Sequence, residues 1–380
     1  MLRMPGGTSW FAHKTSRRRI RGKERDIPKN LRRSSILTLL TVTGLVGAHT
    51  APAAATLGVT CQSVTRTVTL SALETVPQTL TGWLCWRGAL SRTTVQVLVH
   101  GLTYDHNYWD FPAATADQSY VSAATAAGYA TFNIDRIGVG ASSRPVNASV
   151  LTTGTAGYVL HQVVQALRAG QIGGTAFQRV ITVGHSFGSQ AVAKEAGVYD
   201  DVDGVVLSGS MHDTTTQTFT EVLPKFYPAQ LDPKFGPLIP AGYLTTIPGS
   251  RGPIFYNLAD ADLGVVATDE QLKQTATDGE VATVTNGNLE TQDITAPVLV
   301  AVGETDALFC NATLSCADSQ AVLARESGDF SAAACLDAYV LPTAGHSINL
   351  HLNAPAWFAA ALDWTDRRIG ARTGPPAEPC

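Results

Sequence analysis

The pentapeptide at residues 184–188, Gly-His-Ser-Phe-Gly, is the segment of this sequence whose residue types most directly indicate chemistry. It follows an apolar run at residues 179–183 and leads into a helix-like stretch at 190–196. A serine in a G-x-S-x-G motif between a buried strand and a helix is typical of a nucleophile, because the flanking glycines permit a sharp turn that exposes the hydroxyl at a sheet edge. We therefore predict that Ser186 is a nucleophile.

A serine hydroxyl is a weak nucleophile at neutral pH, so it requires a base and a group that orients the base. In this kind of fold the chain order is serine, then an acid, then histidine. Asp306 follows the apolar run 297–302, and we prefer it to Glu304 because the turn at the strand end lies between Gly303 and Asp306. His346 follows the last apolar run, 338–341. We predict that His346 accepts the Ser186 proton and that Asp306 orients the imidazole.

Attack on a carbonyl group produces an oxyanion, which requires N–H donors placed in advance. One donor is expected to be the backbone N–H of Phe187, directly after the nucleophile. The other is expected from the loop after the apolar run 95–99, and we nominate the N–H of Leu102.

Four other histidines lie close to these motifs in the sequence. We expect His351 to lie in the final helix, where it packs or caps. His185 and His100 are expected to be structural, and His212 is expected to be able to reach the pocket. The assignment of the base to His346 depends on the order and position of the three predicted residues, since a lone histidine is more often structural.

Short apolar runs alternate with helical stretches along the chain, which predicts an α/β fold with a mostly parallel sheet and helices on both faces. Residues 59–71 and 79–86 alternate like an antiparallel pair at the edge of the sheet. Between residues 211 and 295 this rhythm is interrupted by recurring prolines and aromatic residues, which indicates an inserted cap or lid. We therefore expect a hydrolase-like core at 56–210 and 296–370, a lid at 211–295 and a flexible tail at 371–380.

The first 55 residues are predicted to be a basic leader and a signal peptide. Residues 1–33 contain eleven Lys or Arg against two acids, an uncharged apolar run follows at 36–48, and small residues that suit cleavage lie at 51–55. This order predicts export to the extracellular side without a stable membrane anchor, and Arg32 and Arg33 leave a twin-arginine route open.

Removal of the basic leader leaves 16 Lys and Arg against 29 Asp and Glu, a formal charge of −13. A chain of this charge is expected to repel nucleic acid and anionic membranes. All six cysteines lie after the leader, which suggests up to three disulfides. We expect Cys61 to pair with Cys85, and the remaining four cysteines to pair among themselves: Cys310, Cys316, Cys335 and Cys380.

Several motifs together resemble the α/β-hydrolase superfamily, specifically its lid-bearing serine hydrolases: V-H-G-L at 99–102, D-R-I-G-V-G-A-S at 135–142, G-H-S-F-G at 184–188, G-E-T-D at 303–306 and G-H at 345–346. The resemblance spans about residues 95–369. It implies the fold and a serine nucleophile but no particular substrate. Haloalkane dehalogenases and epoxide hydrolases look similar, but they use an aspartate nucleophile, which Ser186 excludes.

The leading functional hypothesis is a secreted serine hydrolase that cleaves small or medium, fairly apolar carboxylic esters or lactones through an acyl-enzyme. One alternative is an exported peptidase or amidase, which would need a charged cluster to recognise a chain terminus. Another is a binding protein without catalytic activity on a hydrolase scaffold. No cofactor or metal is expected, because no glycine-rich stretch has the spacing of a phosphate loop and no cysteine spacing fits a zinc site. The oligomeric state is left open.

Overall fold

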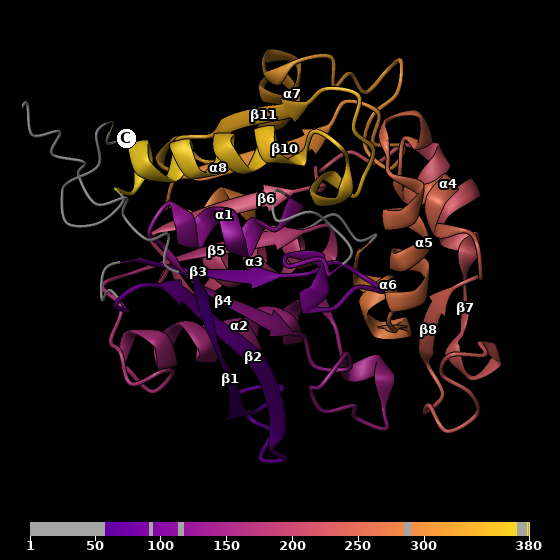
Figure 1. The fold of residues 1–380 in the computed structure, drawn as a ribbon, viewed down its shortest axis with the longest axis horizontal. Coiled ribbons are helices and arrows are strands. Elements are labelled where there is room, and N and C mark those ends of the chain that lie inside the picture. Colours follow the sequence, from indigo (N-terminus) through magenta and orange to yellow (C-terminus); the bar gives the residue numbers. More distant parts are fainter. Residues whose placement is uncertain (1–57, 91–93, 113–117, 285–289, 371–377, 379) are drawn as a thin grey trace, which may run out of the picture. The chain divides into compact units, whose positions relative to one another are not determined.

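One sheet of eight strands organises the chain. The computed structural model describes residues 58–90, 94–112, 118–284, 290–370, 378 and 380, and the strands follow the order β1-β2-β4-β3-β5-β6-β10-β11 (Figure 1). Their bounds are β1 Val59–Val68, β2 Gln78–Arg87, β3 Thr94–Val99, β4 Ala130–Asp135, β5 Arg179–His185, β6 Gly204–Ser208, β10 Val298–Gly303 and β11 Asp337–Leu341. Strand β2 pairs antiparallel with β1 and β4, and every later pair is parallel.

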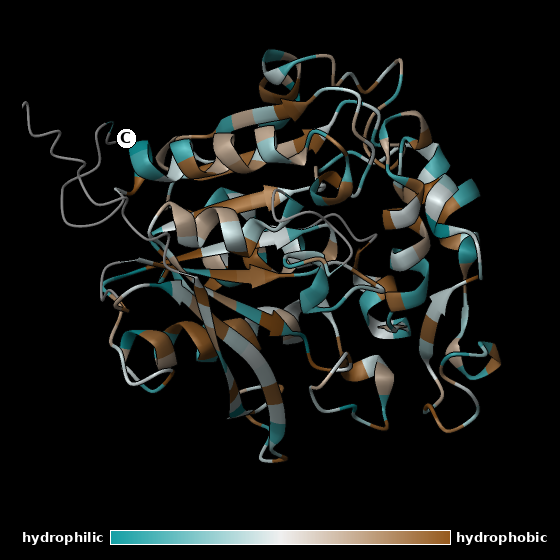
Figure 2. Cartoon of the chain, viewed as in Figure 1, coloured by the Kyte–Doolittle hydropathy of each residue, from teal (hydrophilic) through white to brown (hydrophobic). Residues whose placement is uncertain are grey.

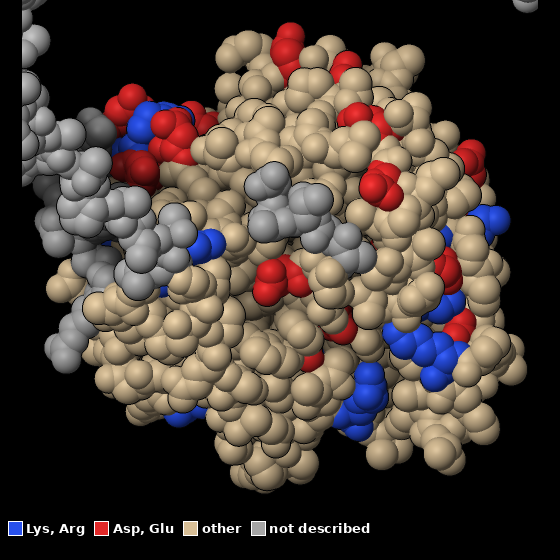
Figure 3. Space-filling view, viewed as in Figure 1, with Lys and Arg blue, Asp and Glu red and all other residues tan. Residues whose placement is uncertain are grey.

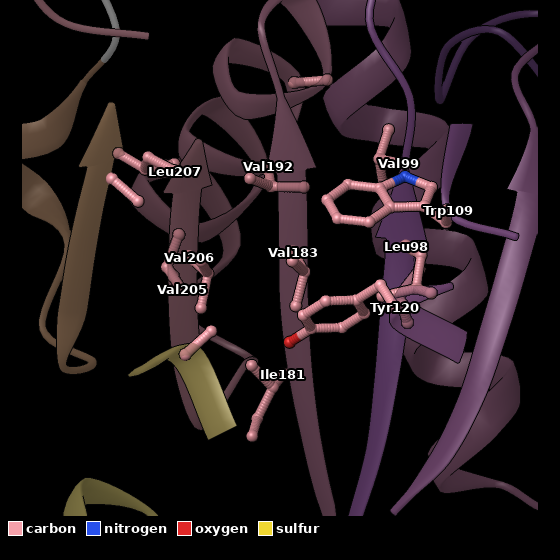
Figure 4. Close-up of a cluster of buried hydrophobic side chains, with 14 of the residues drawn as sticks. Leu98, Val99, Trp109, Tyr120, Ile181, Val183, Val192, Val205, Val206 and Leu207 are labelled. Carbon is pink, nitrogen blue, oxygen red and sulfur yellow. The ribbon is translucent and has the colours of Figure 1, made fainter. Parts of the chain in front are cut away.

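The central strands carry apolar side chains on both faces of the sheet, and they are buried along their length. All residues of β3, β4, β6 and β10 are buried, and the runs of β3, β6 and β10 are rich in Val and Leu, as expected for a parallel sheet covered on both sides. Figure 2 shows the strands at the centre of the sheet as largely hydrophobic, and Figure 4 shows side chains of β3, β5 and β6 such as Leu98, Val183 and Val206 in one cluster. The predicted fold class is confirmed.

Five helices flank the sheet: α1 Tyr120–Ala126, α2 Thr153–Arg168, α3 Phe187–Tyr199, α7 Ser319–Glu326 and α8 Ala354–Arg368. Helix α1 packs against α8, and α2 packs against α3, so that the two pairs cover opposite faces (Figure 1). Helix α2 begins at a threonine cap, because the Thr152 side chain accepts a hydrogen bond from the N–H of Thr155.

Residues 211–295 form an excursion between β6 and β10, which we call the insert. It has its own small sheet in the order β7-β8-β9 and three helices, and it lies at one side of the large sheet in Figure 1. Its elements are β7 Phe226–Pro228, β8 Tyr243–Thr246, β9 Ala276–Thr277, α4 Arg251–Phe255, α5 Leu263–Leu272 and α6 Asp278–Val284. The insert starts where the alternating pattern of the sequence stops, but its strands and helices were not predicted.

Single-turn helices occupy several loops. They are η1 His106–Tyr108, η3 Ala148–Val150, η4 Thr218–Val222, η5 Leu223–Lys225, η6 Ala229–Leu231, η7 Leu258–Asp260, η8 Thr291–Asp293, η9 Ala332–Ala334 and η10 Ile348–Leu350.

Three disulfides link all six cysteines, as the sequence predicts. Cys61 and Cys85 lie opposite each other on β1 and β2, and the other bonds join Cys310 to Cys316 and Cys335 to Cys380. In the ranges described, no helix is both long and apolar enough to cross a membrane. The predicted signal peptide and most of the predicted flexible tail lie outside the described residues.

Candidate active site

Ser186 lies at the tight turn between β5 and α3. Its backbone has φ 54° and ψ −122°, a conformation that non-glycine residues rarely adopt, and its N–H donates to the carbonyl of Ser208 at 2.8 Å. The turn needs the flanking glycines because the backbone approaches closely on both sides. A Cβ at Gly188 would lie 2.1 Å from the carbonyl oxygen of Val99, and one at Gly184 would lie 2.4 Å from the backbone nitrogen of Ser189. This geometry supports the nucleophile predicted from the motif.

Asp306 and His346 meet at the ends of β10 and β11. Both side chains are buried, and the Nδ1–H of His346 donates to Oδ2 of Asp306 at 2.8 Å. The other carboxylate oxygen of Asp306 accepts from the N–H of Leu308 at 2.9 Å, which fixes the carboxylate. Glu304, the acid that the sequence analysis rejected, is exposed and binds the N–H of Thr343 instead. With Nδ1 protonated and bound to Asp306, Nε2 of His346 is free to act as a base.

Ser186 and His346 line the same cavity, although about 160 residues separate them in the chain. The described residues give no direct hydrogen bond between the two side chains. In hydrolases without substrate such contacts are often long, and they shorten when substrate binds. The cavity has about 890 Å³ of empty space, including the part open to solvent.

Most of the lining of this cavity is apolar. Side chains from the core and the insert contribute to it, among them Leu102, Val222, Leu223, Phe226, Phe255 and Phe309. Within the described residues, no Asp, Glu, Lys or Arg lines the cavity. Its polar groups are neutral side chains such as Gln190 and Thr218, together with the histidines. The cavity therefore suits an uncharged, apolar molecule with a reactive polar group at Ser186.

The loop of His346 is held by a second histidine, His351. Nε2 of His351 accepts hydrogen bonds from the N–H groups of Gly345 at 2.9 Å and Asn257 at 3.1 Å. Burial lowers the pKa of His351, as these bonds require, since only the neutral ring can accept them. The expectation that His351 lies in the final helix is wrong: its backbone is extended at the end of η10, and α8 begins only at Ala354, with Pro355 in its first turn.

The predicted oxyanion donors are the backbone N–H groups of Phe187, directly after Ser186, and Leu102, on the loop after β3. Phe187 is the first residue of α3, so its N–H has no partner within the helix. Leu102 lies on the loop after β3, and among the described residues its N–H makes no hydrogen bond. Gly101 permits this loop to approach the nucleophile, because a Cβ there would lie 3.0 Å from the Cβ of Ser186. Among the described residues both N–H groups are therefore without a protein partner, one at the start of α3 and one on the loop after β3.

Arg136 bonds the start of the loop after β3, at residues 100–103, which we call the oxyanion loop because it carries Leu102. Its guanidinium donates to the carbonyl of His100 at 3.0 Å and to that of Gly101 at 3.1 Å, and it forms an ion pair with Glu280 of α6. His100 itself accepts from the N–H of Arg136 at Nε2 and donates from Nδ1 to the carbonyl of Gly101. Burial and the neighbouring Arg136 lower the pKa of His100 to about 3, so this histidine is structural, as predicted.

Arg251, from α4 of the insert, holds the other end of this loop. It is fully buried and donates twice to the carboxylate of Asp269 on α5, at 2.9 Å for each bond. Its Nη1 also donates to the hydroxyl of Thr103 at 2.8 Å and to the carbonyl of Thr103 at 3.3 Å. Thr103 has φ 59°, so the bonds of Arg251 stabilise a strained residue next to Leu102.

Tyr104 connects the oxyanion loop to the loop of His346. Its hydroxyl lies 3.2 Å from Oδ2 of Asp269 and 2.7 Å from Oγ of Ser347, the residue after His346. The N–H of Ser347 in turn donates to the carbonyl of Phe255 in α4 at 2.9 Å. One buried polar network therefore joins the insert to both loops of the site.

His185 and His212, the other two histidines near the predicted motifs, lie in different environments. His185 is fully buried and stacks on Tyr108 with 4.2 Å between ring centroids, and burial lowers its pKa well below the usual value. His212 lines the cavity, as predicted, but its Nδ1 is bound to Glu326 at 2.7 Å and its Nε2 to Thr291 at 2.8 Å. Neither ring is placed to replace His346.

The residues that support the site rather than line it were not predicted from the sequence. Arg136 carried a signal, because a charged residue directly after a buried strand needs a partner at the sheet edge. Arg251, Asp269 and Tyr104 carried none, since nothing in their spacing relates them before the insert folds. Charged side chains are sparse on the face shown in Figure 3, whereas the buried polar network is dense.

A model of the alpha/beta hydrolase family matches residues 96–361. The alpha/beta hydrolase GrgF from Penicillium sp. sh18 is similar in structure, with a TM-score of 0.54 and 14% identity, covering 82% of this chain and 99% of that chain. An esterase from Exiguobacterium antarcticum has a TM-score of 0.53 and 13% identity, with coverages of 76% and 96%. No curated protein matches the sequence.

Proposed function

The chain belongs to the alpha/beta hydrolase family, and on this basis we propose that it is a serine hydrolase that cleaves apolar carboxylic esters or lactones. The observation that carries the proposal is that Ser186 and His346, whose Nδ1 is bonded to Asp306, line one mainly apolar cavity with no Asp, Glu, Lys or Arg in its described lining. The esterase from Exiguobacterium antarcticum has the same fold, which agrees with this activity.

The proposed reaction begins when the Ser186 hydroxyl attacks the carbonyl carbon of the ester and His346 accepts its proton at Nε2. Asp306 stabilises the imidazolium that forms. The N–H groups of Phe187 and Leu102 donate to the oxyanion of the tetrahedral intermediate. The intermediate collapses to an acyl-enzyme as the C–O bond breaks, and His346 returns the proton to the departing alcohol. Water, deprotonated by His346, then attacks the acyl-enzyme and releases the acid and Ser186.

An ester is favoured over a peptide as the substrate because of the charge in the cavity. A peptidase that acts at a chain terminus needs a charged side chain to bind the terminal amine or carboxylate. In the described part of the chain, no Asp, Glu, Lys or Arg lines the cavity, and the ring of His212 is already bonded to Glu326 and Thr291. An ester or lactone with an apolar acyl or alcohol group needs only the apolar walls and the oxyanion donors.

We further propose that the protein is exported and works outside the cytoplasm. Three disulfides use every cysteine of the chain, and disulfides persist mainly in oxidising compartments. The basic and apolar order of the first 55 residues is the second support for export.

A fluorophosphonate probe tests the nucleophile. We expect one probe molecule per chain in the wild type and none in Ser186→Ala. The matched control is Ser189→Ala, three residues further on, where the hydroxyl donates to the carbonyl of Ser208 and points away from the proposed chemistry. Failure of the folded wild type to react, or loss of labelling only in Ser189→Ala, would refute a Ser186 hydrolase and favour a binding protein.

A substrate panel tests the class of bond that is cleaved. Nitrophenyl esters of graded chain length, simple lactones and aminoacyl anilides would be compared by kcat/KM. We expect ester or lactone cleavage to exceed anilide cleavage by at least about 100-fold, because no Asp, Glu, Lys or Arg of the described residues lines the cavity to bind a charged terminus. A preference for anilides would replace the esterase proposal with a peptidase or amidase.

A further inference from the structure

A group of three metal-binding side chains lies away from the catalytic cavity, between α2 and the end of α3. It consists of His161 on α2, Glu195 on α3 and Asp201 on the loop before β6, which we call the α2–α3 cluster. The possible ligand atoms of these residues all lie within 4.8 Å of one another. Nδ1 of His161 is 2.8 Å from Oδ2 of Asp201.

Glu195 is the residue that makes this cluster unusual. Its side chain is fully buried, and among the described residues neither of its carboxylate oxygens has a hydrogen-bond donor. Oδ1 of Asp201 is also buried without a donor. Buried carboxylate oxygens without a partner are rare, because each has lost its bonds to water. Two neighbouring residues with three such oxygens between them need a positive ligand or a proton.

A second group of one histidine and two carboxylates shows how a purely structural cluster looks. Asp105, His106 and Asp135 are equally close together, but their carboxylates are satisfied by the protein. Asp135 accepts from the backbone N–H and the ring of His106 and from the N–H of Ala141. Asp105 accepts from Asn107 and Gln274. Proximity alone therefore does not distinguish the α2–α3 cluster, whereas its unpartnered oxygens do.

The charges around the α2–α3 cluster favour a cation. Two carboxylates face one imidazole, and the nearest guanidinium, Arg168, is already paired with Asp203 at 2.6 Å. Arg168 reaches Asp201 only at its backbone carbonyl, and Gln165 donates to Oδ2. Burial and the neighbouring Asp201 raise the pKa of Glu195 well above its usual range, so a proton is the natural competitor for the cation.

We propose that His161, Glu195 and Asp201 bind one divalent transition-metal ion of the zinc class. One imidazole and two carboxylates are a ligand set that zinc accepts, and the nitrogen ligand favours a transition metal over calcium or magnesium. Binding requires the loss of the proton on the His161 nitrogen that faces Asp201 and of any proton shared by the two acids. The His161 side chain is 27% exposed, so water can reach the site and complete a tetrahedral shell.

The ion would join three segments that otherwise meet through ordinary packing. Helix α2, the last turns of α3 and the loop into β6 would share one centre. Helix α3 begins at Phe187, directly after the nucleophile, so the ion would fasten the far end of the helix that forms the elbow. The expected effect is on stability, and it does not depend on the proposed hydrolase activity.

Zinc content and thermal unfolding test this proposal on the purified full chain. After treatment with EDTA and dialysis, the protein would be titrated with zinc chloride, and bound zinc would be measured by mass spectrometry. We expect one zinc per chain and a rise in Tm of about 2–4 °C at a zinc concentration roughly ten times the Kd. Calcium at the same concentration should not raise the Tm.

Two variants and one control decide between a metal and a shared proton. Glu195→Gln and His161→Gln should each lose the bound zinc and the rise in Tm, whereas His106→Gln, in the satisfied cluster, should keep both. If the carboxyls only share a proton, zinc leaves the Tm of the wild type unchanged, and Glu195→Gln is as stable as the wild type because its amide donates to Asp201. That result, or zinc binding that is unaffected by Glu195→Gln and His161→Gln, would overturn the proposal.

Discussion

Arg251 of the insert donates from Nη1 to both the hydroxyl and the carbonyl oxygen of Thr103, at 2.8 and 3.3 Å. Thr103 follows Leu102, the proposed oxyanion donor, and has φ 59°. The insert therefore supports the loop that carries Leu102 as well as lining the cavity. Because Asp269 orients Arg251 through two further bonds, the geometry of the loop depends on a buried ion pair in a different part of the chain.

Replacement of Arg251 by lysine should impair catalysis more than binding. Lysine keeps the charge, but it cannot bond Asp269 twice and Thr103 at the same time. We expect kcat to fall about 10–100-fold with little change in KM, because the donors of an oxyanion hole act mainly in the transition state. Steady-state kinetics on an ester substrate measure both constants.

The control for this variant is Lys225→Arg, a conservative change at an exposed position of the same insert, which should leave both constants unchanged. The thermal unfolding of Arg251→Lys must be recorded as well, since a weakened buried pair destabilises the fold. A folded Arg251→Lys enzyme with the kcat of the wild type would show that the loop holds its shape without the arginine.

Replacement of Asp306 by asparagine should remove most of the activity while the fold remains intact. The amide cannot hold the His346 ring in the tautomer that leaves Nε2 free, and we expect kcat to fall by about 10³–10⁴. The matched control is Glu304→Gln, two residues earlier, where the side chain is exposed and accepts from the N–H of Thr343. Equal losses in the two variants, measured as kcat/KM, would contradict the assignment of Asp306.

The sequence predicted the parts of the molecule that depend on local patterns. The strands of the large sheet coincide with the apolar runs of the sequence. Ser186 lies at the strained turn that its flanking glycines indicate. The chain order and the positions after two strand ends predicted Asp306 and His346, and in the structure a hydrogen bond joins these two side chains. These features were predictable because each depends on a strand and the few residues that follow it.

The supporting network could not be predicted, because its partners come from elements with no common sequence pattern. Tyr104, Arg251 and Asp269 lie on a core loop and on two helices of the insert, up to 165 residues apart. Those helices are short, and prolines and glycines interrupt the apolar periodicity that would identify them. His351 was misplaced because the pattern of α8 does not show where the helix begins. Its ring bonds the loop before the helix, and only the folded chain provides that partner.

The buried neutral histidines should contribute less stability as the pH is lowered below about 6.5. Burial lowers the pKa of His100 to about 3, so the unfolded chain takes up a proton in this range and the native chain does not. The loss approaches about 1.4 kcal/mol per pH unit for such a group. His185 and His351 shift in the same direction because they are buried too. Unfolding by urea between pH 7 and 5 measures the slope.

The variant that isolates this effect is His100→Asn, which should show a shallower slope than the wild type over the same pH range. The control is His106→Gln. Burial lowers the pKa of His106, but its hydrogen bond to Asp135 outweighs burial, so the pKa is raised overall. Its contribution is therefore lost only as the pH rises above 6.5, and His106→Gln should leave the slope between pH 6.5 and 5 nearly unchanged. An unaltered slope in His100→Asn would contradict a neutral, buried His100.

Leu223→Trp should make the enzyme prefer esters with a shorter acyl chain. Leu223 lines the cavity from the insert and is partly buried, so the larger ring would occupy space beside the reactive serine. We expect the ratio of kcat/KM for a butyrate ester over an octanoate ester to rise about 10–100-fold, in line with the free energy of excluding a few methylene groups. Leu231→Trp, at an exposed position of the insert outside the cavity, is the control. No change in the ratio would place the acyl group elsewhere.

The insert contributes to the site in two separable ways. Its buried arginine and carboxylates fix the backbone donors, whereas the stretch at 218–226 supplies much of the apolar wall and includes Phe219, which is half exposed. Mutations in the wall can therefore alter which molecules fit without disturbing the groups that carry out the reaction. In variants of this protein, new substrate preferences should therefore arise from changes in the wall at 218–226. Changes at the buried Arg251 and Asp269 of the same insert should be tolerated poorly.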